Sequence, residues 1–233
     1  MRKYNNFKEV ITCLNNSGIL YLVLRNFDNL LKESMYMDGH GDVDMLVTDS
    51  HAVAKILDAG TYELHGDDGI HYWIEVNKKK VSLDLRFVGD GYYCKKWENE
   101  MLERRVNHDG YFIMQYQDYF YSLIYHAILQ KKEFSEEYQY RLGIMSKQIN
   151  VKLPDSPNVN DYIKVLERYM KEHNYTYTWP TDKHVPLNKK LIDNSLLEKN
   201  VDLQWIHWKY EMKLKYINFA MKCKHLIINR EFK

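Results

Sequence analysis

Two aspartates stand at the entrance of a short apolar run in the segment GHGDVDMLV, residues 39–47. Because side chains alternate across a strand, Asp42 and Asp44 project from one face, and Val43 and Met45 project from the other. Two carboxylates this close repel each other, which a cation would relieve. Magnesium suits such a pair because it prefers hard oxygen ligands and leaves coordination positions for phosphate oxygens. The segment therefore predicts a strand that carries a metal-binding carboxylate pair.

A third acidic residue, Asp84, lies within the apolar segment VSLDLRFV, residues 81–88. Strand alternation puts Ser82, Asp84 and Arg86 on one face. An aspartate in such a strand is costly unless it is paired or binds a metal. If this strand lies beside residues 43–47, the three carboxylates converge on one metal site. The alternative is an ion pair between Asp84 and Arg86 or a lysine of residues 78–80.

Three residues near these carboxylates are predicted to contact a nucleotide's phosphates. Arg25 ends the first apolar run, ILYLVLRNF, and its guanidinium can hold phosphate oxygens in bidentate fashion. A structural ion pair is an equally good interpretation of Arg25. Asn26 follows at the predicted turn, and Arg86 can bind phosphate or pair with Asp84. Two metals held by Asp42 and Asp44 would neutralise a triphosphate for in-line attack.

The hydrophobic pattern predicts an α/β (α+β) chain: a mixed sheet flanked by helices, followed by a helical C-terminal domain. We place the first domain at residues 1–115 and the second at residues 116–233. The sequence predicts helices at 5–16, 51–59 (capped by Ser50), 95–103, 116–132, 135–149 (capped by Ser135), 160–172 and 201–230, and strands at 19–27, 43–47, 61–65, 71–76, 81–88 and 111–114.

Composition narrows the classes of partner. The 233 residues are 45% hydrophobic and 28% charged, which is typical of a globular chain, and the net charge is +1. We expect no nucleic-acid partner, because no broad basic surface is indicated. The three separated cysteines form no metal-binding or disulfide pattern, and no apolar run is long enough to span a membrane. These features favour a cytoplasmic protein.

The arrangement of a strand, GDVDMLV and a later strand with a single aspartate resembles the polymerase-beta-like nucleotidyltransferase superfamily. LVLRNF followed by GHGDVDMLV looks like uncharacterised bacterial nucleotidyltransferases of surface-polysaccharide gene clusters; the likeness covers about residues 18–90, and is weaker in DYFYSLIYHAILQKK. It implies a Mg²⁺ (or Mn²⁺) enzyme that uses a nucleoside triphosphate such as ATP, with Asp42, Asp44 and Asp84 as its metal carboxylates. Arg25-Asn26-Phe27 replaces the superfamily's Gly-Ser. Because asparagine tolerates positive φ, the turn can survive this change.

Three functions remain open at this point. The first is transfer of a nucleoside monophosphate to a hydroxyl or phosphate of a small or glycan-linked acceptor. The second is phosphoryl or phospho-alditol transfer in envelope polysaccharide assembly, and the third is non-catalytic nucleotide binding. We expect the acceptor pocket between the two halves, walled by the 116–131 helix and the Trp179-Pro180 crossing. His126, in the middle of that helix, is predicted to be a core or rim histidine, with substrate contact as the alternative.

The C-terminal segment carries an aromatic stripe at helical spacing. Its members are Trp205, Trp208, Met212, Tyr216, Phe219, Cys223 and Ile227. We expect this stripe to pack against its own domain. A homodimer interface and peripheral contact with an anionic membrane are the alternatives, because lysines fill the intervening positions.

Overall fold

The structure is a computed structural model that describes residues 2–32, 42–63 and 68–231, with side chains of the last helix described to residue 222. Gly39–Gly41 of the acidic segment and residues 64–65 of a predicted strand lie outside these ranges. The strands are β1 (Lys3–Tyr4), β2 (Tyr21–Val23), β3 (Asp42–Val47), β4 (Gly60–Thr61), β5 (His71–Val76), β6 (Lys79–Phe87), β7 (Val106–His108) and β8 (Tyr111–Ile113). The helices are α1 (Phe7–Ser17), α2 (Ser50–Leu57), α3 (Lys95–Glu103), α4 (Tyr116–Ile124), α5 (Glu136–Gln148), α6 (Val159–His173) and α7 (Val201–Glu231), with short turns η1 (Phe27–Asn29), η3 (Tyr125–Leu129) and η4 (Asn194–Leu196).

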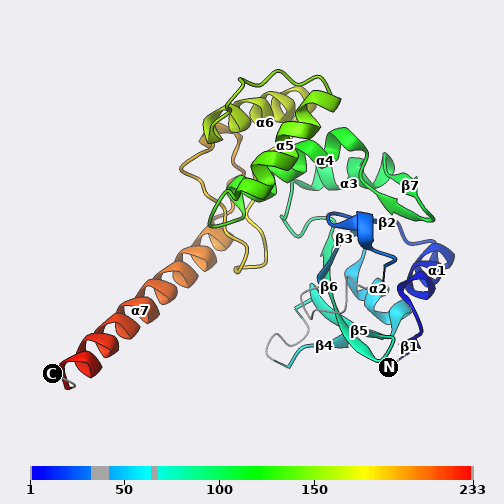
Figure 1. Cartoon of the computed structure of the whole chain (residues 1–233), viewed down its shortest axis with the longest axis horizontal. Helices are drawn as coiled ribbons and strands as arrows, with labels where there is room; N and C mark the ends of the chain where they lie inside the picture. Colours follow the sequence, from blue (N-terminus) through cyan, green and yellow to red (C-terminus); the bar gives the residue numbers. More distant parts are fainter. Residues whose placement is uncertain (1, 33–41, 64–67, 232–233) are drawn as a thin grey trace.

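The expected mixed α/β fold is confirmed. Within the described residues, eight strands form one sheet in the order β1-β5-β6-β3-β2-β8-β7, and β4 pairs with β5. The acidic strand β3 is central, antiparallel to β2 and parallel to β6. Helices α1 and α2 contact each other beside the sheet, whereas α4, α5 and α6 gather in a separate helical layer (Figure 1). The sheet therefore places the acidic strand next to the strand that carries Asp84.

The β5–β6 hairpin is tighter than the sequence predicts. We placed its turn at residues 77–80, but Val76 pairs with Lys79, and the turn consists of Asn77 and Lys78 alone. Both residues have positive φ, 49° and 61°, as the commonest two-residue hairpin turn requires. The shorter turn moves the register by two residues, so that His71 lies opposite Asp84.

Helix caps explain where several elements begin. The Asp49 side chain, rather than that of Ser50, caps α2 by accepting a hydrogen bond from the Ala52 amide at 3.0 Å. Aspartate caps well because its carboxylate also meets the positive end of the helix dipole. The Ser135 cap of α5 is confirmed by a 3.4 Å bond from the Tyr138 amide.

The helix predicted over residues 116–132 changes character midway. Its α-helical part α4 ends at Ile124 and continues as the π-helical turn η3. Such turns are rare and often occur at functional sites. Buried hydrophobic residues from both sides of the predicted boundary at residue 115 form one continuous cluster. The division into two domains stays a prediction.

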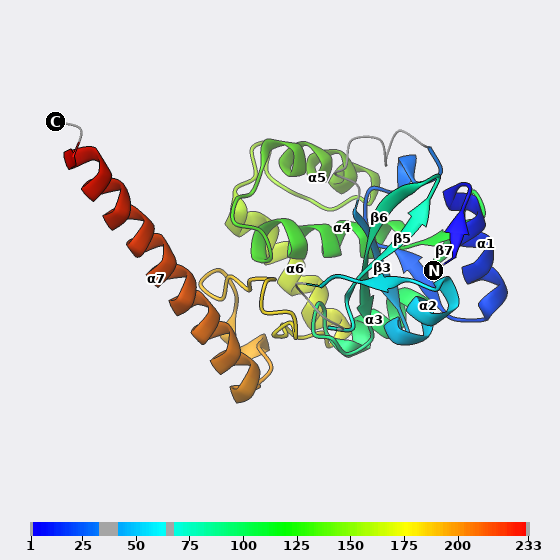
Figure 2. The same ribbon diagram turned by 90° about the horizontal axis from the view of Figure 1, so that it is seen from below.

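The expectation that the stripe on α7 packs against its own domain is wrong for the stripe residues whose side chains are described, and Cys223 and Ile227 lie outside that range. Trp205, Met212, Tyr216 and Phe219 are all exposed, and α7 projects from the rest of the molecule (Figure 2). The physical reason is a second apolar row on the opposite side of the helix, because a helix that is apolar on two sides cannot bury both against one domain. That second row consists of Ile206, Tyr210, Leu214, Ile217 and Met221. Dimer and membrane contact stay predictions.

No described helix combines the length and apolar character that a membrane span requires.

Candidate functional site

The three predicted carboxylates lie on one face of the sheet. In the parallel register of β3 and β6, Asp44 lies directly opposite Asp84, and Asp42 lies opposite Ser82. Neighbouring strands are about 4.8 Å apart, so paired side chains on one face are in close proximity. Asp42, Asp44 and Asp84 all line one cavity of about 390 Å³. Convergence of the three carboxylates required that residues 81–88 lie beside residues 43–47, and β3 and β6 are indeed neighbouring parallel strands.

The environment of Asp84 disfavours its negative charge. Burial, followed by the neighbouring Asp44 carboxylate, raises the pKa of the Asp84 carboxyl to about 6. Arg86 and His71 act in the opposite direction and lower that pKa. A carboxylate that is both partly desolvated and next to a like charge gains from a bound cation.

The contacts of Arg25 combine the two roles that the sequence left open, a structural ion pair and a phosphate contact. Its Nη2 forms an ion pair with Asp44 Oδ1 at 2.7 Å, and the side chain is buried. Its other terminal nitrogen, Nη1, is buried and has no hydrogen-bond partner. A buried donor without a partner is energetically costly. One half of the guanidinium thus holds Asp44, and the other half retains a donor for a ligand oxygen.

Arg86 pairs more closely with a residue that the sequence analysis missed. Its Nη2 donates to Asp182 Oδ2 at 3.1 Å, whereas the nearest Asp84 oxygen is 4.0 Å away. Nε and Nη1 of Arg86 are buried and have no hydrogen-bond partner, although Nη1 lies 3.9 Å from Asp90. Asp182 comes from the extended crossing between α6 and η4, and it lines the same cavity as Arg86.

Asn26 adopts the turn that the sequence predicts. Its φ is 55° and its ψ is 30°, in the left-handed region, and it lines the same cavity as Arg25. Asparagine is one of the few residues other than glycine that occupies this region readily. The chain can therefore turn sharply after β2 without the Gly-Ser pair.

A neutral polar wall closes the back of the cavity. Tyr92 hydroxyl and His126 Nδ1 are hydrogen bonded at 2.8 Å, and Gln130 Nε2 donates to the Tyr92 carbonyl at 2.8 Å. Burial lowers the pKa of His126 well below its usual value and raises that of Tyr92 to about 12, so both side chains are neutral at pH 7. The buried, hydrogen-bonded His126 agrees with the prediction of a core histidine, although it also lines the cavity.

His71 is the second functional candidate that the sequence analysis missed. Its Nε2 lies 4.0 Å from Asp84 Oδ1 and 3.8 Å from Asp182 Oδ2, and its Nδ1 lies 2.6 Å from Asp68. The available signal was the hairpin register, because a two-residue turn at Asn77 places His71 opposite Asp84. Asp182 had no comparable signal, since it reaches the site through tertiary packing of an irregular segment.

The next question is whether the acidic side chains are arranged to bind a metal ion. Among residues 2–32, 42–63 and 68–231, no group of three or more histidine, cysteine, aspartate or glutamate side chains is arranged to hold a metal ion. In this arrangement Arg25 occupies an oxygen of Asp44. Metal binding by Asp42, Asp44 and Asp84 therefore stays a prediction.

Comparison of the chain with protein-family models, with curated proteins and with solved structures finds no match.

Proposed function

We propose that the protein is a metal-dependent nucleotidyltransferase that moves a nucleoside monophosphate from a nucleoside triphosphate to a hydroxyl or phosphate of a small or glycan-linked acceptor. The observation that carries the proposal is the direct pairing of Asp44 with Asp84 across β3 and β6. Asp42 stands on the same face of β3, at the mouth of a 390 Å³ cavity. Paired carboxylates on adjacent strands are the ligand type that magnesium prefers.

The oxygen donors of this site are of the type that Mg²⁺ or Mn²⁺ prefers. Asp42, Asp44 and Asp84 offer hard oxygen ligands, and the mutual repulsion of Asp44 and Asp84 favours a cation between them. When bound, the metal would neutralise charge on the triphosphate and polarise its α-phosphorus. We assign to Asp84 the further role of orienting the acceptor, because it lies on the cavity side of β6.

The two buried arginines are suited to the donor's phosphates. Arg25 Nη1, Arg86 Nε and Arg86 Nη1 are buried donors without a hydrogen-bond partner in the protein. A phosphate oxygen would satisfy each of them, and hydrogen bonds between charged groups are among the strongest in proteins. The Tyr92 ring lies against both guanidinium groups, at 5.6 Å from Arg25 and 4.6 Å from Arg86, and so limits their motion.

Nucleotide calorimetry tests this function. Titration with ATP, CTP, GTP and UTP in the presence of Mg²⁺ should reveal a preferred nucleotide. In the Asp42→Ala/Asp44→Ala double variant, its affinity should fall at least ~10-fold. Asp109→Asn is the matched control, because Asp109 is exposed and is not among the residues that line the cavity. Absence of nucleotide binding, or equal binding by the double variant, would refute the proposal.

The ion pair between Arg25 and Asp44 supports a second candidate, a non-catalytic nucleotide-binding relative. Arg25 competes with a cation for the Asp44 oxygen at 2.7 Å. Such a protein would bind the triphosphate without releasing pyrophosphate. Mass spectrometry of the products separates the candidates: pyrophosphate marks nucleotidyl transfer, a different phosphorus-containing product marks phosphoryl or phospho-alditol transfer, and intact nucleotide marks binding alone.

We propose the cytoplasm as the location of the protein. Cys13 and Cys94 are free thiols, and Cys94 is buried. Unpaired cysteines are typical of a reducing compartment.

A further inference from the structure

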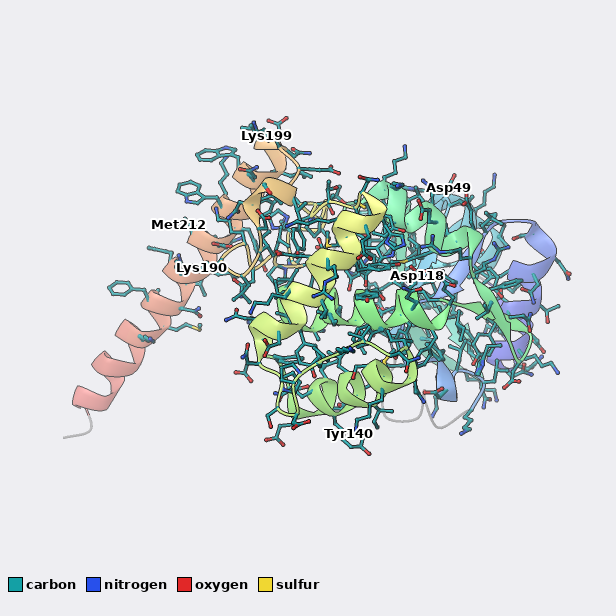
Figure 3. The ribbon with its side chains drawn as sticks, turned by 90° about the horizontal axis from the view of Figure 1, so that it is seen from above. Asp49, Asp118, Tyr140, Lys190, Lys199 and Met212 are labelled. Atoms are coloured by element: carbon teal, nitrogen blue, oxygen red, sulfur yellow. The ribbon has the colours of Figure 1, made fainter. Side chains whose placement is uncertain are left out.

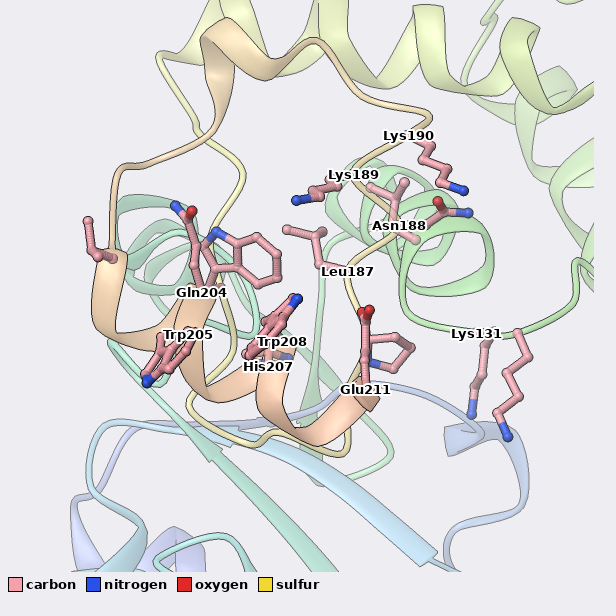
Figure 4. A pocket seen from close by; sticks show the side chains of 15 residues that line it. Lys131, Leu187, Asn188, Lys189, Lys190, Gln204, Trp205, His207, Trp208 and Glu211 are labelled. Carbon is pink, nitrogen blue, oxygen red and sulfur yellow. The ribbon is translucent and has the colours of Figure 1, made fainter. Parts of the chain in front are cut away.

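A second cavity, of about 650 Å³, opens where α7 leaves the body of the protein. Trp205 and Trp208 line it from α7, Trp179 from the extended crossing, and Lys189 and Lys190 from the loop that follows (Figure 4). We call it the indole–lysine cavity. Its volume is in the range of small-molecule sites.

Specific contacts hold this cavity in shape. His207, on the docked side of α7, is buried and donates from Nε2 to the Pro180 carbonyl at 2.7 Å. The His207 ring also packs on Trp179, with 5.3 Å between centroids. On the opposite wall, the Asn188 amide donates to the Leu129 carbonyl at 3.0 Å and ties the loop to η3. The first turns of α7 are thus fixed against the body, in contrast to the exposed remainder of the helix.

The tryptophans provide flat apolar surface and one indole N–H group without a hydrogen-bond partner. Trp205 and Trp208 are stacked, with centroids 4.8 Å apart and planes 8° apart, yet each is about half exposed, at 52% and 50%. Trp179 is 7% exposed, and its buried Nε1 has no hydrogen-bond partner. A buried indole N–H normally finds a partner. A ligand with a flat apolar face and a hydroxyl acceptor would satisfy both features.

The excess of positively charged side chains in the cavity favours an anionic ligand. Lys131, Lys132, Lys189 and Lys190 line it against the single carboxylate of Glu211. Gln204 and Asn188 add amide groups that can bond hydroxyls. Sugars present C–H faces that stack on indoles and hydroxyls that bond to amides and carboxylates, and a phosphate on the sugar would meet the lysines.

The indole–lysine cavity adjoins the carboxylate site. Lys131 and Pro186 line both cavities. A ligand that stacks on the tryptophans and reaches Lys131 would therefore lie at the wall that the two cavities share, beside the site where the donor's phosphates are proposed to lie. The Trp179-Pro180 crossing contributes Trp179 to this cavity, but all of the lining residues belong to the second half of the chain, whereas the sequence predicts the acceptor pocket between the two halves.

We infer that the indole–lysine cavity binds the acceptor, and that the acceptor is a sugar phosphate; the reaction assigned to it rests on the proposed function. In that reaction, a phosphate oxygen of the sugar forms a bond to the α-phosphorus of the triphosphate. The bond from the α-phosphorus to the bridging oxygen breaks, and pyrophosphate leaves with the electron pair. The products are a nucleotide-linked sugar and pyrophosphate.

Tryptophan fluorescence of the full chain, with EDTA and without nucleotide, tests the cavity separately from the reaction. The probes are glucose 1-phosphate, glucose 6-phosphate, ribose 5-phosphate and glycerol 3-phosphate, with inorganic phosphate, glucose and AMP for comparison. At least one sugar phosphate should bind more tightly than inorganic phosphate, glucose and AMP. Trp208→Ala and Lys190→Gln should each weaken that binding ~10-fold.

Two matched controls lie farther along α7. Tyr216→Ala and Lys213→Gln remove an exposed aromatic ring and an exposed lysine from the same helix, and should change the affinity less than ~2-fold. Circular dichroism checks that Trp208→Ala is folded, and Lys190→Gln alters only a surface charge. The inference is wrong if no sugar phosphate binds better than inorganic phosphate, if the cavity and control variants bind alike, or if AMP is the preferred ligand at Trp208.

Failure of the two proposals can be distinguished. Sugar-phosphate binding that needs Trp208, without any pyrophosphate release from nucleotides, would support the cavity and refute the transferase. Pyrophosphate release that Asp84→Asn abolishes but Trp208→Ala leaves unchanged would support the transferase and refute the cavity as its acceptor site.

Discussion

Two clusters of arginine and aspartate occur in this protein, and they differ in how completely their polar groups are paired. In the first, Asp118 is fully buried within the helical part (Figure 3). It accepts hydrogen bonds from Trp97 and Tyr169, each at 2.9 Å, and from Arg104 at 2.9 and 3.2 Å. Arg104 also donates to Glu100 at 2.6 Å. Protein groups alone satisfy this network.

The second cluster, at the carboxylate site, contains the same residue types with unused capacity. Arg25 Nη1 and Arg86 Nε are buried without a hydrogen-bond partner, and Arg86 Nη1 has only the Asp90 carboxylate at 3.9 Å, beyond hydrogen-bond distance. Buried polar groups in folded proteins are nearly always paired, so each exception needs an explanation. A complete network is what stability favours, whereas an incomplete one in a cavity is what a charged ligand requires. The comparison leads us to assign stability to Asp118 and function to Asp84.

Removal of Asp118 should have the largest effect on stability. Asp118→Ala leaves the Trp97 and Tyr169 donors buried without an acceptor and removes the partner of Arg104. Loss of one partner from such a buried network costs ~3–5 kcal/mol of unfolding free energy. Denaturant unfolding measures it, with exposed Asp109→Asn as the control. An unchanged midpoint for Asp118→Ala would remove the distinction between the clusters.

Asp84→Asn should do the opposite and stabilise the protein while impairing nucleotide binding. The variant removes a partly desolvated charge beside Asp44, and we expect a gain of ~1–2 kcal/mol at pH 8 in EDTA. Nucleotide affinity with Mg²⁺ should fall in the same variant. A loss of stability at pH 8 would contradict the assignment of Asp84 to function.

The same variant has a defined pH dependence. The folded pKa of Asp84, about 6, is raised above its unfolded value near ~3.9. The carboxyl therefore destabilises the wild type above pH 6, and this penalty disappears as pH falls from 6 towards 4. The advantage of Asp84→Asn should shrink over that window. Urea unfolding of both proteins at pH 8, 6 and 4.5 checks this, and a constant or growing difference would contradict the shift.

Arg25→Lys should have a smaller effect that is confined to binding. A lysine can keep the charge next to Asp44, but it cannot also offer the second nitrogen that Arg25 Nη1 provides. We expect nucleotide affinity to fall ~10-fold, about 1.4 kcal/mol. The control is Arg141→Lys, because Arg141 pairs with the exposed Glu137 on α5. Equal nucleotide affinity for wild type and Arg25→Lys would place Arg25 with the structural arginines.

Local sequence patterns could predict the carboxylate face but not the whole site. Asp42, Asp44 and Asp84 follow from strand alternation, which depends only on neighbours in the chain. His71 required the hairpin register, and the two-residue error in the predicted turn moved it off Asp84.

Other features depend on contacts that no local pattern encodes. Asp182 reaches Arg86 across 96 positions in sequence, from a segment without regular structure. The stripe on α7 showed which side chains share a face, but periodicity does not say what covers that face. The failed expectation for α7 and the missed Asp182 have the same physical cause, because both depend on how distant segments pack.

Substitution of Asn26 should have the smallest effect of the variants considered. The sequence indicated that asparagine tolerates a positive φ, and the structure supplies the actual φ and ψ of the turn. The Asn26 φ of 55° is accessible to glycine without strain, so Asn26→Gly should change unfolding free energy by less than ~0.5 kcal/mol. Asn26→Ala should cost ~1 kcal/mol, because a β-carbon strains the left-handed region. Denaturant midpoints of the two variants give the order. If alanine were tolerated as well as glycine, the turn after β2 would not depend on positive φ, and the argument that asparagine replaces Gly-Ser here would fail.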